Sequence, residues 1–212
     1  MTVNKAKKGA GRPSAEEAES KRRNLLEAAL NEFAEVGFHR ASARDIAHRA
    51  GVSTRTLYNH YADKSALFEA CLDMNSQMMM PSTEWEEGDL ATRLFHYTVA
   101  LHKQHWTDRA RKIGRLIYRE ASVFDDVREI TRQQFERFQV GPVVTILRQA
   151  GFREEDCRRL ATYFVVMALG EWQRSILFDA PPLAPEEFES QARDVVRVFL
   201  LGALAQARAL SI

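Results

Sequence analysis

The segment 42–64, SARDIAHRAGVSTRTLYNHYADK, limits the fold of this chain more than any other part of the sequence. Its apolar residues recur at helical spacing in two short stretches, and each stretch follows a serine that can cap a helix, Ser42 or Ser53. Between them stands Gly51, which readily adopts the left-handed conformation that often ends a helix. The pattern predicts two short helices joined by a tight turn.

The second of these helices has one apolar and one polar face. Leu57 and Tyr61 lie four residues apart and share the apolar side. The opposite side carries Thr54, Arg55, Thr56, Asn59 and His60. Side chains of this kind can donate hydrogen bonds to phosphates and base edges. The segment therefore predicts a helix-turn-helix whose second helix enters the major groove of DNA.

The order of residues in this segment is more specific than its pattern. The string DIAxxAGVSxxTLYxHYxxKxxL, within residues 21–71, resembles the DNA-binding domain of the TetR family of bacterial regulators. The resemblance implies an all-α fold, with an N-terminal three-helix helix-turn-helix domain and a C-terminal helical domain for ligand binding and dimerisation. It also implies a transcriptional regulator, a repressor that a small ligand releases from a palindromic operator. The alternative is an all-helical small-molecule-binding protein or enzyme with an incidental helix-turn-helix.

The residues expected to contact DNA follow from the polar face and from the resemblance. Arg55 stands where many family members have glycine or another small residue, and its guanidinium can itself bind a guanine. By resemblance, Arg44 is a second candidate base reader. Phosphate contacts are expected from Ser42, His60 and Lys64. The full set of candidates is Ser42, Arg44, Ser53, Thr54, Arg55, Thr56, Tyr58, Asn59, His60 and Lys64.

Charge is distributed unevenly along the 212 residues. Residues 1–65 hold twelve Lys and Arg against eight Asp and Glu, whereas the remainder holds eighteen against twenty-one. A basic N-terminal part suits a protein that touches DNA at one end. We expect a disordered basic arm over 1–18, a helix-turn-helix domain over 19–65 and a ligand-binding and dimerisation domain over 66–212. The arm either keeps the chain soluble or reaches DNA, and both readings stay open.

Apolar periodicity predicts further helices along the chain. Pro142 lies inside one of them and should kink it, because proline lacks the N–H of a helix hydrogen bond. A polar loop is expected at 82–89. The expected helices span 19–36, 63 to about 80, 90–106, a stretch ending near 123, 125–150, 154–178 and 186–209.

The last two expected helices, 154–178 and 186–209, are the most apolar. Gly170 and Gly202 lie inside them, at a cost of about 1 kcal/mol each relative to alanine. Close approach of another helix would justify that cost. The family resemblance implies that these helices form a four-helix bundle with the same helices of a second subunit, giving a homodimer. The alternative is packing within one chain only.

A ligand cavity is expected between the helices of the C-terminal domain, again by resemblance. Its aromatic and methionine content suggests an apolar or aromatic effector. Each candidate could instead be ordinary core, since apolar residues at helical spacing usually pack together. The candidates are Phe95, Val99, His102, Trp106, Tyr118, Phe138, Phe164, Met167 and Trp172.

Other functions find little support in the sequence. No nucleophile, P-loop or metalloprotease motif is present, so we expect no enzyme and no cofactor. His102 and His105 are three residues apart, but no third ligand can be placed beside them, so we expect no metal. Two cysteines form no disulfide framework. Because no apolar run resembles a signal peptide or membrane span, we expect a cytoplasmic protein.

Overall fold

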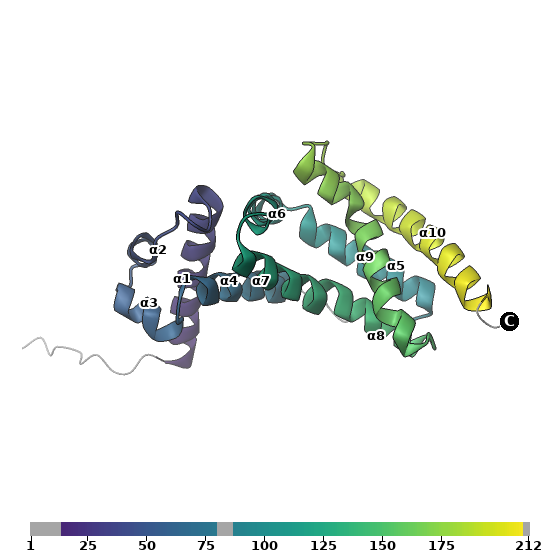
Figure 1. The fold of residues 1–212 in the computed structure, drawn as a ribbon, viewed down its shortest axis with the longest axis horizontal. Helices are drawn as coiled ribbons and strands as arrows, with labels where there is room; N and C mark the ends of the chain where they lie inside the picture. Colours follow the sequence, from purple (N-terminus) through teal and green to yellow (C-terminus); the bar gives the residue numbers. More distant parts are fainter. Residues whose placement is uncertain (1–13, 80–86, 210–212) are drawn as a thin grey trace, which may run out of the picture.

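The computed structural model describes residues 14–79 and 87–209, with side chains over 14–76 and 87–202. The described chain is helical and contains no strand, which confirms the all-α prediction. The molecule is elongated: the head, residues 15–60, lies at one end, and the body, residues 64–209, extends away from it (Figure 1).

The head consists of three helices, α1 (Ala15–Val36), α2 (Ala43–Arg49) and α3 (Thr54–His60). The structure begins α1 earlier than the expected residue 19. The Oγ of Ser14 accepts a hydrogen bond from the Glu17 amide at 3.1 Å, while the Glu17 carboxylate accepts one from the Ser14 amide. This capping box satisfies two amides that would otherwise lack partners. Residues 15–18 therefore belong to α1 rather than to the expected arm, and residues 1–13 lie outside the described residues.

The helix α4 (Lys64–Met79) connects the head to the body. Asp63 caps it as expected, with Oδ1 accepting from the Ala66 amide at 2.8 Å. Phe68, on the buried side of α4, packs edge-on against Phe33 of α1 with ring centroids 5.2 Å apart. The expected continuation to residue 80 and most of the expected loop at 82–89 lie outside the described residues.

Six further α-helices build the body, and α10 packs along α5 while α8 packs on α9. These helices are α5 (Leu90–His105), α6 (Asp108–Ala121), α7 (Asp125–Phe135), α8 (Gly141–Gln149), α9 (Glu154–Leu177) and α10 (Phe188–Ala209). A 3-10 turn at Pro185–Glu187 precedes α10, so this helix starts two residues later than expected.

The helix expected over 125–150 is divided into α7, a π-helical turn (Glu136–Val140) and α8. Pro142 stands in the first turn of α8, where its missing N–H removes a bond to the preceding turn. A π turn is a common way for a helix to absorb such a break. The disturbance predicted at Pro142 therefore takes the form of a wider turn just before it.

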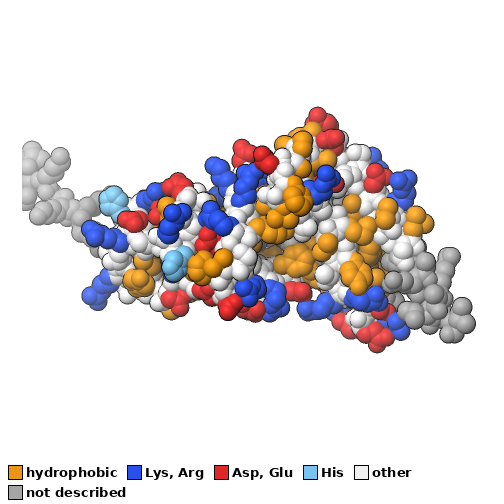
Figure 2. Space-filling model, turned by 45° about the horizontal axis from the view of Figure 1, so that its top comes forward, with side chains coloured by type: hydrophobic (Ala, Val, Ile, Leu, Met, Phe, Trp, Pro, Cys, Tyr) orange, Lys and Arg blue, Asp and Glu red, His pale blue; other side chains and the backbone are white. Residues whose placement is uncertain are grey.

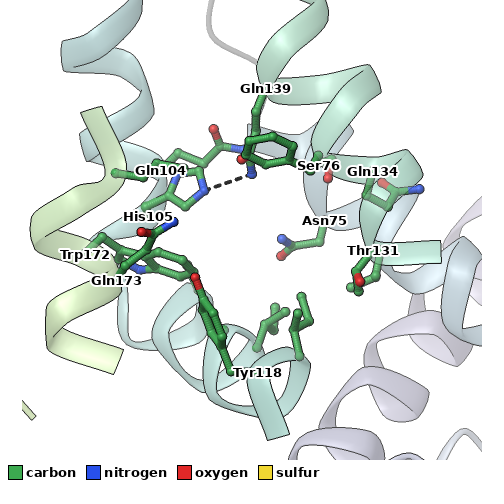
Figure 3. A pocket seen from close by; sticks show the side chains of 17 residues that line it. Asn75, Ser76, Gln104, His105, Tyr118, Thr131, Gln134, Gln139, Trp172 and Gln173 are labelled. Atoms are coloured by element: carbon green, nitrogen blue, oxygen red, sulfur yellow. Dashed lines mark hydrogen bonds between the residues drawn. The ribbon is translucent and has the colours of Figure 1, made fainter. Parts of the chain in front are cut away.

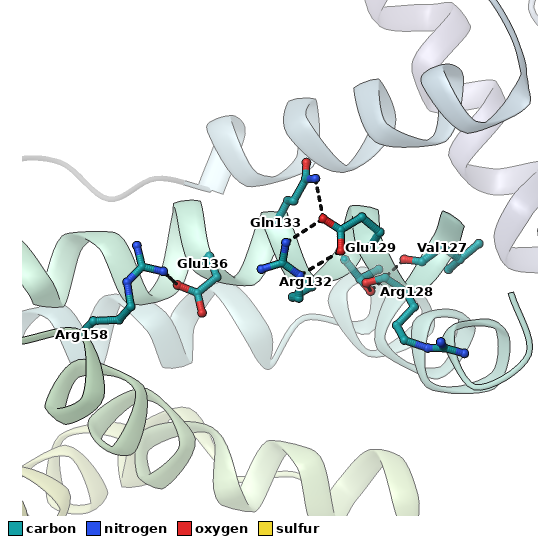
Figure 4. A network of polar contacts seen from close by, with 8 residues as sticks. Val127, Arg128, Glu129, Arg132, Gln133, Glu136 and Arg158 are labelled. Carbon is teal, nitrogen blue, oxygen red and sulfur yellow. Dashed lines mark hydrogen bonds and ion pairs between the residues drawn. The ribbon is translucent and has the colours of Figure 1, made fainter. Parts of the chain in front are cut away.

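Ion pairs cover the outer side of this divided helix (Figure 4). On α7, the Glu129 carboxylate accepts two hydrogen bonds from Arg132, at 2.9 and 2.6 Å, and another from Gln133. At the π turn, Arg158 of α9 donates to Glu136 at 2.7 Å. Exposed pairs contribute little free energy. The Glu129 bonds stay within α7, whereas the Arg158–Glu136 pair connects the π turn to α9.

Buried apolar side chains form two clusters. One fills the head and continues into the body through Phe68, Leu116 of α6 and Val127 of α7. The other lies among α5, α8, α9 and α10, where the rings of Phe164 and Phe199 meet at 4.9 Å. Because the head core includes side chains of α4, α6 and α7, any displacement of these helices changes the support of the head.

Candidate nucleic-acid interface and ligand cavity

The helix α3 has the two faces that the sequence predicts. Leu57 is 1% exposed and Tyr61 is buried beside it. On the other side, Tyr58 is 54% exposed. The remaining exposed candidates of α3 are Thr54, Arg55, Asn59 and His60. A seven-residue helix held by its apolar side thus presents its polar side to solvent.

Caps fix both helices of the motif at their first turns. The Ser42 Oγ accepts from the Asp45 amide at 3.1 Å, and the Ser53 Oγ accepts from the Thr56 amide at 3.0 Å. Gly51 has φ +66°, in the left-handed region, and no neighbour crowds it. The predicted caps and turn are therefore confirmed. Three candidate DNA contacts, Ser42, Ser53 and Thr56, take part in these caps, since the hydroxyls of Ser53 and Thr56 also share a hydrogen bond of 2.8 Å.

Lys64 has a structural role that the sequence did not reveal. Its Nζ donates to the carbonyl oxygens of His39 at 2.8 Å and Ala41 at 3.3 Å. It also lies over the ring of Phe38, 4.9 Å from the centroid. Burial lowers the pKa of Lys64. The ammonium therefore joins the start of α4 to the loop between α1 and α2.

A cavity of about 180 Å³ lies inside the body (Figure 3). Side chains from α4, α5, α6, α7 and α9 line it, and the π turn contributes Gln139. Its wall is largely apolar, and uncharged polar groups stand among the apolar side chains. These groups belong to Asn75, Ser76, Gln104, His105, Tyr118, Thr131, Gln134, Gln139, Trp172 and Gln173.

Two of the nine expected ligand contacts, Tyr118 and Trp172, line this cavity. Phe164 and His102 are instead buried in the body core, 0% and 1% exposed, and the His102 Nε2 lies 3.0 Å from the Ala168 carbonyl oxygen. Phe95 lines a separate surface groove together with Arg193. The other four are absent from the cavity wall: Val99, Trp106, Phe138 and Met167.

His105 replaces His102 as the histidine of the cavity. Its Nδ1 lies 2.9 Å from the Leu101 carbonyl oxygen, and because a carbonyl only accepts, Nδ1 carries the proton. The Nε2 of His105 is then an acceptor, and the amide nitrogen of Gln139 donates to it at 3.2 Å. Burial lowers the pKa of His105 to about 4. The imidazole is therefore neutral near pH 7.

Three buried polar atoms of cavity residues have no hydrogen-bond partner within the described part of the chain. They are the indole Nε1 of Trp172 and the amide Oε1 atoms of Gln134 and Gln139. Buried polar atoms are nearly always paired, because leaving one unpaired costs about 1–3 kcal/mol. The wall of the cavity thus contains one free donor and two free acceptors.

Gly114 of α6 makes room for Trp172. A Cβ at this glycine would lie 2.6 Å from the indole Cζ2, closer than real contacts allow. On its other side, the indole meets the His105 ring edge-on, with centroids 5.1 Å apart. These neighbours fix the indole against the cavity, and any larger residue at 114 would displace it.

A relay of polar side chains connects the cavity to the head. Asn75 lines the cavity, and its Oδ1 accepts from the Arg109 Nε at 3.2 Å. The Nη1 of the same Arg109 donates to Glu27 of α1 at 2.6 Å. One side chain of α6 therefore holds both the connecting helix α4 and the first helix of the head.

The outer faces of α9 and α10 expose apolar side chains. Tyr163, Val166 and Met167 of α9 are 52%, 45% and 37% exposed, and Val198 and Leu201 of α10 are 55% and 70% exposed. In Figure 2 hydrophobic side chains form broad patches on the body. We call the five exposed residues Tyr163, Val166, Met167, Val198 and Leu201 the α9–α10 apolar face.

The two mid-helix glycines of this region are not explained by packing within the chain. Among the described residues, a Cβ at Gly170 or at Gly202 would meet no atom within 4 Å. No close approach inside the protomer therefore justifies their cost in helix stability.

The helix-turn-helix segment matches a known protein family. Residues 25–71, which include α2, α3 and the turn between them, match the family model described as bacterial regulatory proteins of the tetR family. Residues 25–71 therefore belong to the TetR family of bacterial regulatory proteins. The resemblance drawn from DIAxxAGVSxxTLYxHYxxKxxL is thereby confirmed.

Curated relatives are similar to this chain over part of their length. The uncharacterized HTH-type transcriptional regulator YvkB of Bacillus subtilis (strain 168) is 29% identical over 105 residues, 50% of this chain and 54% of YvkB. The HTH-type transcriptional regulator BetI of Klebsiella pneumoniae (strain 342) is 44% identical over 59 residues, 27% of this chain and 30% of BetI. The alignments thus span about half or less of these relatives.

Solved structures share the fold over most of the chain. A putative TetR-family transcriptional regulator from Mesorhizobium loti matches with a TM-score of 0.70 and 21% identity, covering 87% of this chain and 96% of that one. A putative transcriptional regulator from Pseudomonas aeruginosa PAO1 matches with a TM-score of 0.67 and 22% identity, covering 90% and 93%. At this identity the likeness concerns the fold alone.

Most of the residues that line the cavity were not predicted from the sequence. The missed residues include apolar ones such as Ile113 and Phe135, and the search for an apolar pocket also passed over the glutamines of the wall, Gln104, Gln134, Gln139 and Gln173. Within the described residues no group of metal-ligating side chains gathers, and no helix is long and apolar enough to cross a membrane.

Proposed function

We propose that this TetR-family regulator is a repressor that binds a palindromic operator as a homodimer and leaves it when a small molecule enters the body cavity. The observation that carries the proposal is the division of α3 into a buried side, with Leu57, and an exposed polar side, with Arg55 and Tyr58. Helices of this kind enter the major groove with their polar side against the bases.

The residues of α3 have separate roles in this proposal. Arg55 reads a guanine, with Tyr58 and Thr54 at neighbouring bases or phosphates. His60 and the hydroxyl of Ser42 hold phosphates, which position the head without specifying sequence. Arg44, exposed in the first turn of α2, is the second base reader. The DNA lies in the cytoplasm, where the protein acts.

Two heads are needed, and the α9–α10 apolar face supplies the contact between them. Paired recognition helices must lie about 34–36 Å apart to meet successive major grooves. Burial of exposed side chains such as Val166 and Leu201 against a second copy removes apolar surface from water. The same contact explains Gly170 and Gly202, because a partner helix can approach closely where no Cβ projects.

Release follows if the ligand favours a different separation of the heads. A compound in the cavity contacts Asn75 of α4 and therefore acts on the Arg109 relay to α1. Only a difference in affinity between the two arrangements can shift their populations. A coupling free energy of about 1–3 kcal/mol would lower operator affinity roughly 5- to 150-fold.

Selection from a library of random double-stranded DNA tests the proposal. We expect the purified protein to enrich a palindrome with two half-sites separated by about one helical turn. Absence of any enriched sequence, with small molecules still bound, would favour the alternative of a helical binding protein without a role on DNA.

A further inference from the structure

On the assumption that the proposed function holds, we propose that the body cavity selects an uncharged, flat aromatic compound that carries both a hydrogen-bond donor and a hydrogen-bond acceptor. This goes beyond the expectation of an apolar or aromatic ligand, because it assigns protein atoms to the polar groups of the compound and excludes ions.

Exclusion of ions follows from the charge of the wall. Among the described residues that line the cavity, none is Asp, Glu, Lys or Arg. Two charged side chains hydrogen-bond to cavity residues, Arg109 to Asn75 and Asp73 to Gln134. Glu27 balances the charge of Arg109, whose Nη2 is a buried atom without a partner in the described part of the chain. His105 is held neutral, with both ring nitrogens bonded. A carboxylate or ammonium group would lose its hydration here without meeting an opposite charge, which is costly.

The hydrogen-bonding pattern follows from the orientation of two glutamine amides. The nitrogen of Gln139 donates to His105, and the nitrogen of Gln134 donates to Asp73 at 2.9 Å. Each amide is thereby oriented, and its Oε1 is the buried atom without a partner. These oxygens accept from an N–H or O–H of the ligand, while the indole N–H of Trp172 donates to a ligand carbonyl or ether oxygen.

Ring shape and size follow from the aromatic part of the wall. The ring centroids of Trp172 and Tyr118 lie 6.4 Å apart at an interplanar angle of 46°, and Phe135 adds a third ring. Flat rings stack or meet edge-on with such neighbours. A cavity of about 180 Å³ is below the usual range of about 300–1,000 Å³ for drug-sized ligands. The compound therefore has about two fused rings.

Three matched two-ring probes test the proposal on the wild-type protein by titration calorimetry and thermal shift. 2-Quinolone is neutral and carries one N–H and one carbonyl oxygen. N-Methyl-2-quinolone lacks only the donor, and quinoline-2-carboxylate is an anion. We expect 2-quinolone to bind and to raise the melting temperature, the N-methyl compound to bind about tenfold more weakly, and the carboxylate not to bind.

Variants assign the contacts. Trp172→Phe keeps a ring but removes the N–H, and it should weaken binding of 2-quinolone about tenfold. Trp106→Phe, which alters an indole outside the cavity wall, should leave binding unchanged. In Gln134→Leu/Gln139→Leu the N-methyl compound should bind as well as 2-quinolone, because both acceptors that distinguish the two probes are gone. Circular dichroism of each variant shows that it is folded.

Several results would overturn the proposal: binding of the carboxylate as tight as that of 2-quinolone, equal binding of the two neutral probes to wild type, or no binding of any probe. The comparison of probes on the wild-type protein requires no substitution, so its result does not depend on whether a variant folds. Operator binding is measured on the same preparations without probe. Intact operator binding with failed probes refutes the ligand class alone, whereas probe binding without operator binding refutes the proposed function alone.

Discussion

Arg109 of α6 and Glu27 of α1 form an ion pair, with Nη1 and Oε2 2.6 Å apart, across the boundary between body and head. The pair is partly shielded, since the side chains are 39% and 29% exposed. Arg109 also holds Asn75, a residue of the cavity wall. The same guanidinium thus bonds to the cavity wall through Asn75 and to the head through Glu27.

Arg109→Gln should uncouple the cavity from the head. We expect 2-quinolone to bind the variant within about twofold of wild type, while its effect on operator affinity falls by a large part of the ~1–3 kcal/mol coupling. Fluorescence anisotropy of labelled operator, with and without probe, measures this. Arg115→Gln is the control, because Arg115 lies on the same helix as Arg109 but pairs with the exposed Asp179. Full release by the Arg109 variant would exclude the relay.

Charges on the α9–α10 apolar face should separate the dimer. In Val166→Glu/Leu201→Glu a carboxylate would be buried on each helix of the contact without a partner, which is unfavourable by several kcal/mol. Light scattering should then show a folded monomer that no longer binds operator. Leu201 is a better position than Leu200, which packs against the body core.

The control for this dimer test is Val123→Glu, since Val123 is 67% exposed but lies between α6 and α7. It should remain dimeric. A double variant that also stays dimeric would remove this face from the interface.

Stability should fall in mild acid because of His105. Burial lowers the pKa of His105 from about 6.5 to about 4, so the unfolded chain takes up the proton first as pH falls. The unfolding free energy is therefore unaffected by the titration of His105 above about pH 6.5. Towards pH 4 it falls progressively, by at most about 3 kcal/mol. Urea unfolding across this range should show a weaker pH dependence in His105→Gln than in wild type. His48→Gln, at an exposed site, should match wild type.

Lys64→Met should affect the fold of the head as well as DNA binding. The variant leaves two carbonyl oxygens, of His39 and Ala41, without their charged donor, and we expect a loss of about 1–3 kcal/mol of unfolding free energy. If Lys64 also holds a phosphate, the slope of log affinity against log salt flattens by about one. Lys103→Met, on the exposed side of α5, should change neither quantity. Unchanged stability in Lys64→Met would contradict the structural role.

Local interactions explain why the helix-turn-helix could be predicted from sequence. The caps at Ser42 and Ser53 and the left-handed Gly51 are set by residues within a few positions. The cavity depends instead on which side of each helix meets which neighbour. His102 and His105 differ by three positions, yet one lies in the core and the other at the cavity.

Features that depend on contacts between helices could not be predicted from the sequence. Gly114 has no local signal, because its function is to admit the Trp172 indole from α9. The polar residues of the cavity wall were missed because glutamines in helices are usually exposed. Only the packing of the helices places Gln134 and Gln139 at the cavity.

The central claim is that the exposed side of α3 reads DNA, and anisotropy titration of the selected operator against Arg55→Ala tests it most directly. Arg174→Ala, an exposed arginine of the body, is the control. We predict that Arg55→Ala loses about 1–3 kcal/mol of operator binding and its preference at one base pair per half-site, while the control binds as wild type does. Unchanged affinity and unchanged base preference in Arg55→Ala would contradict the account.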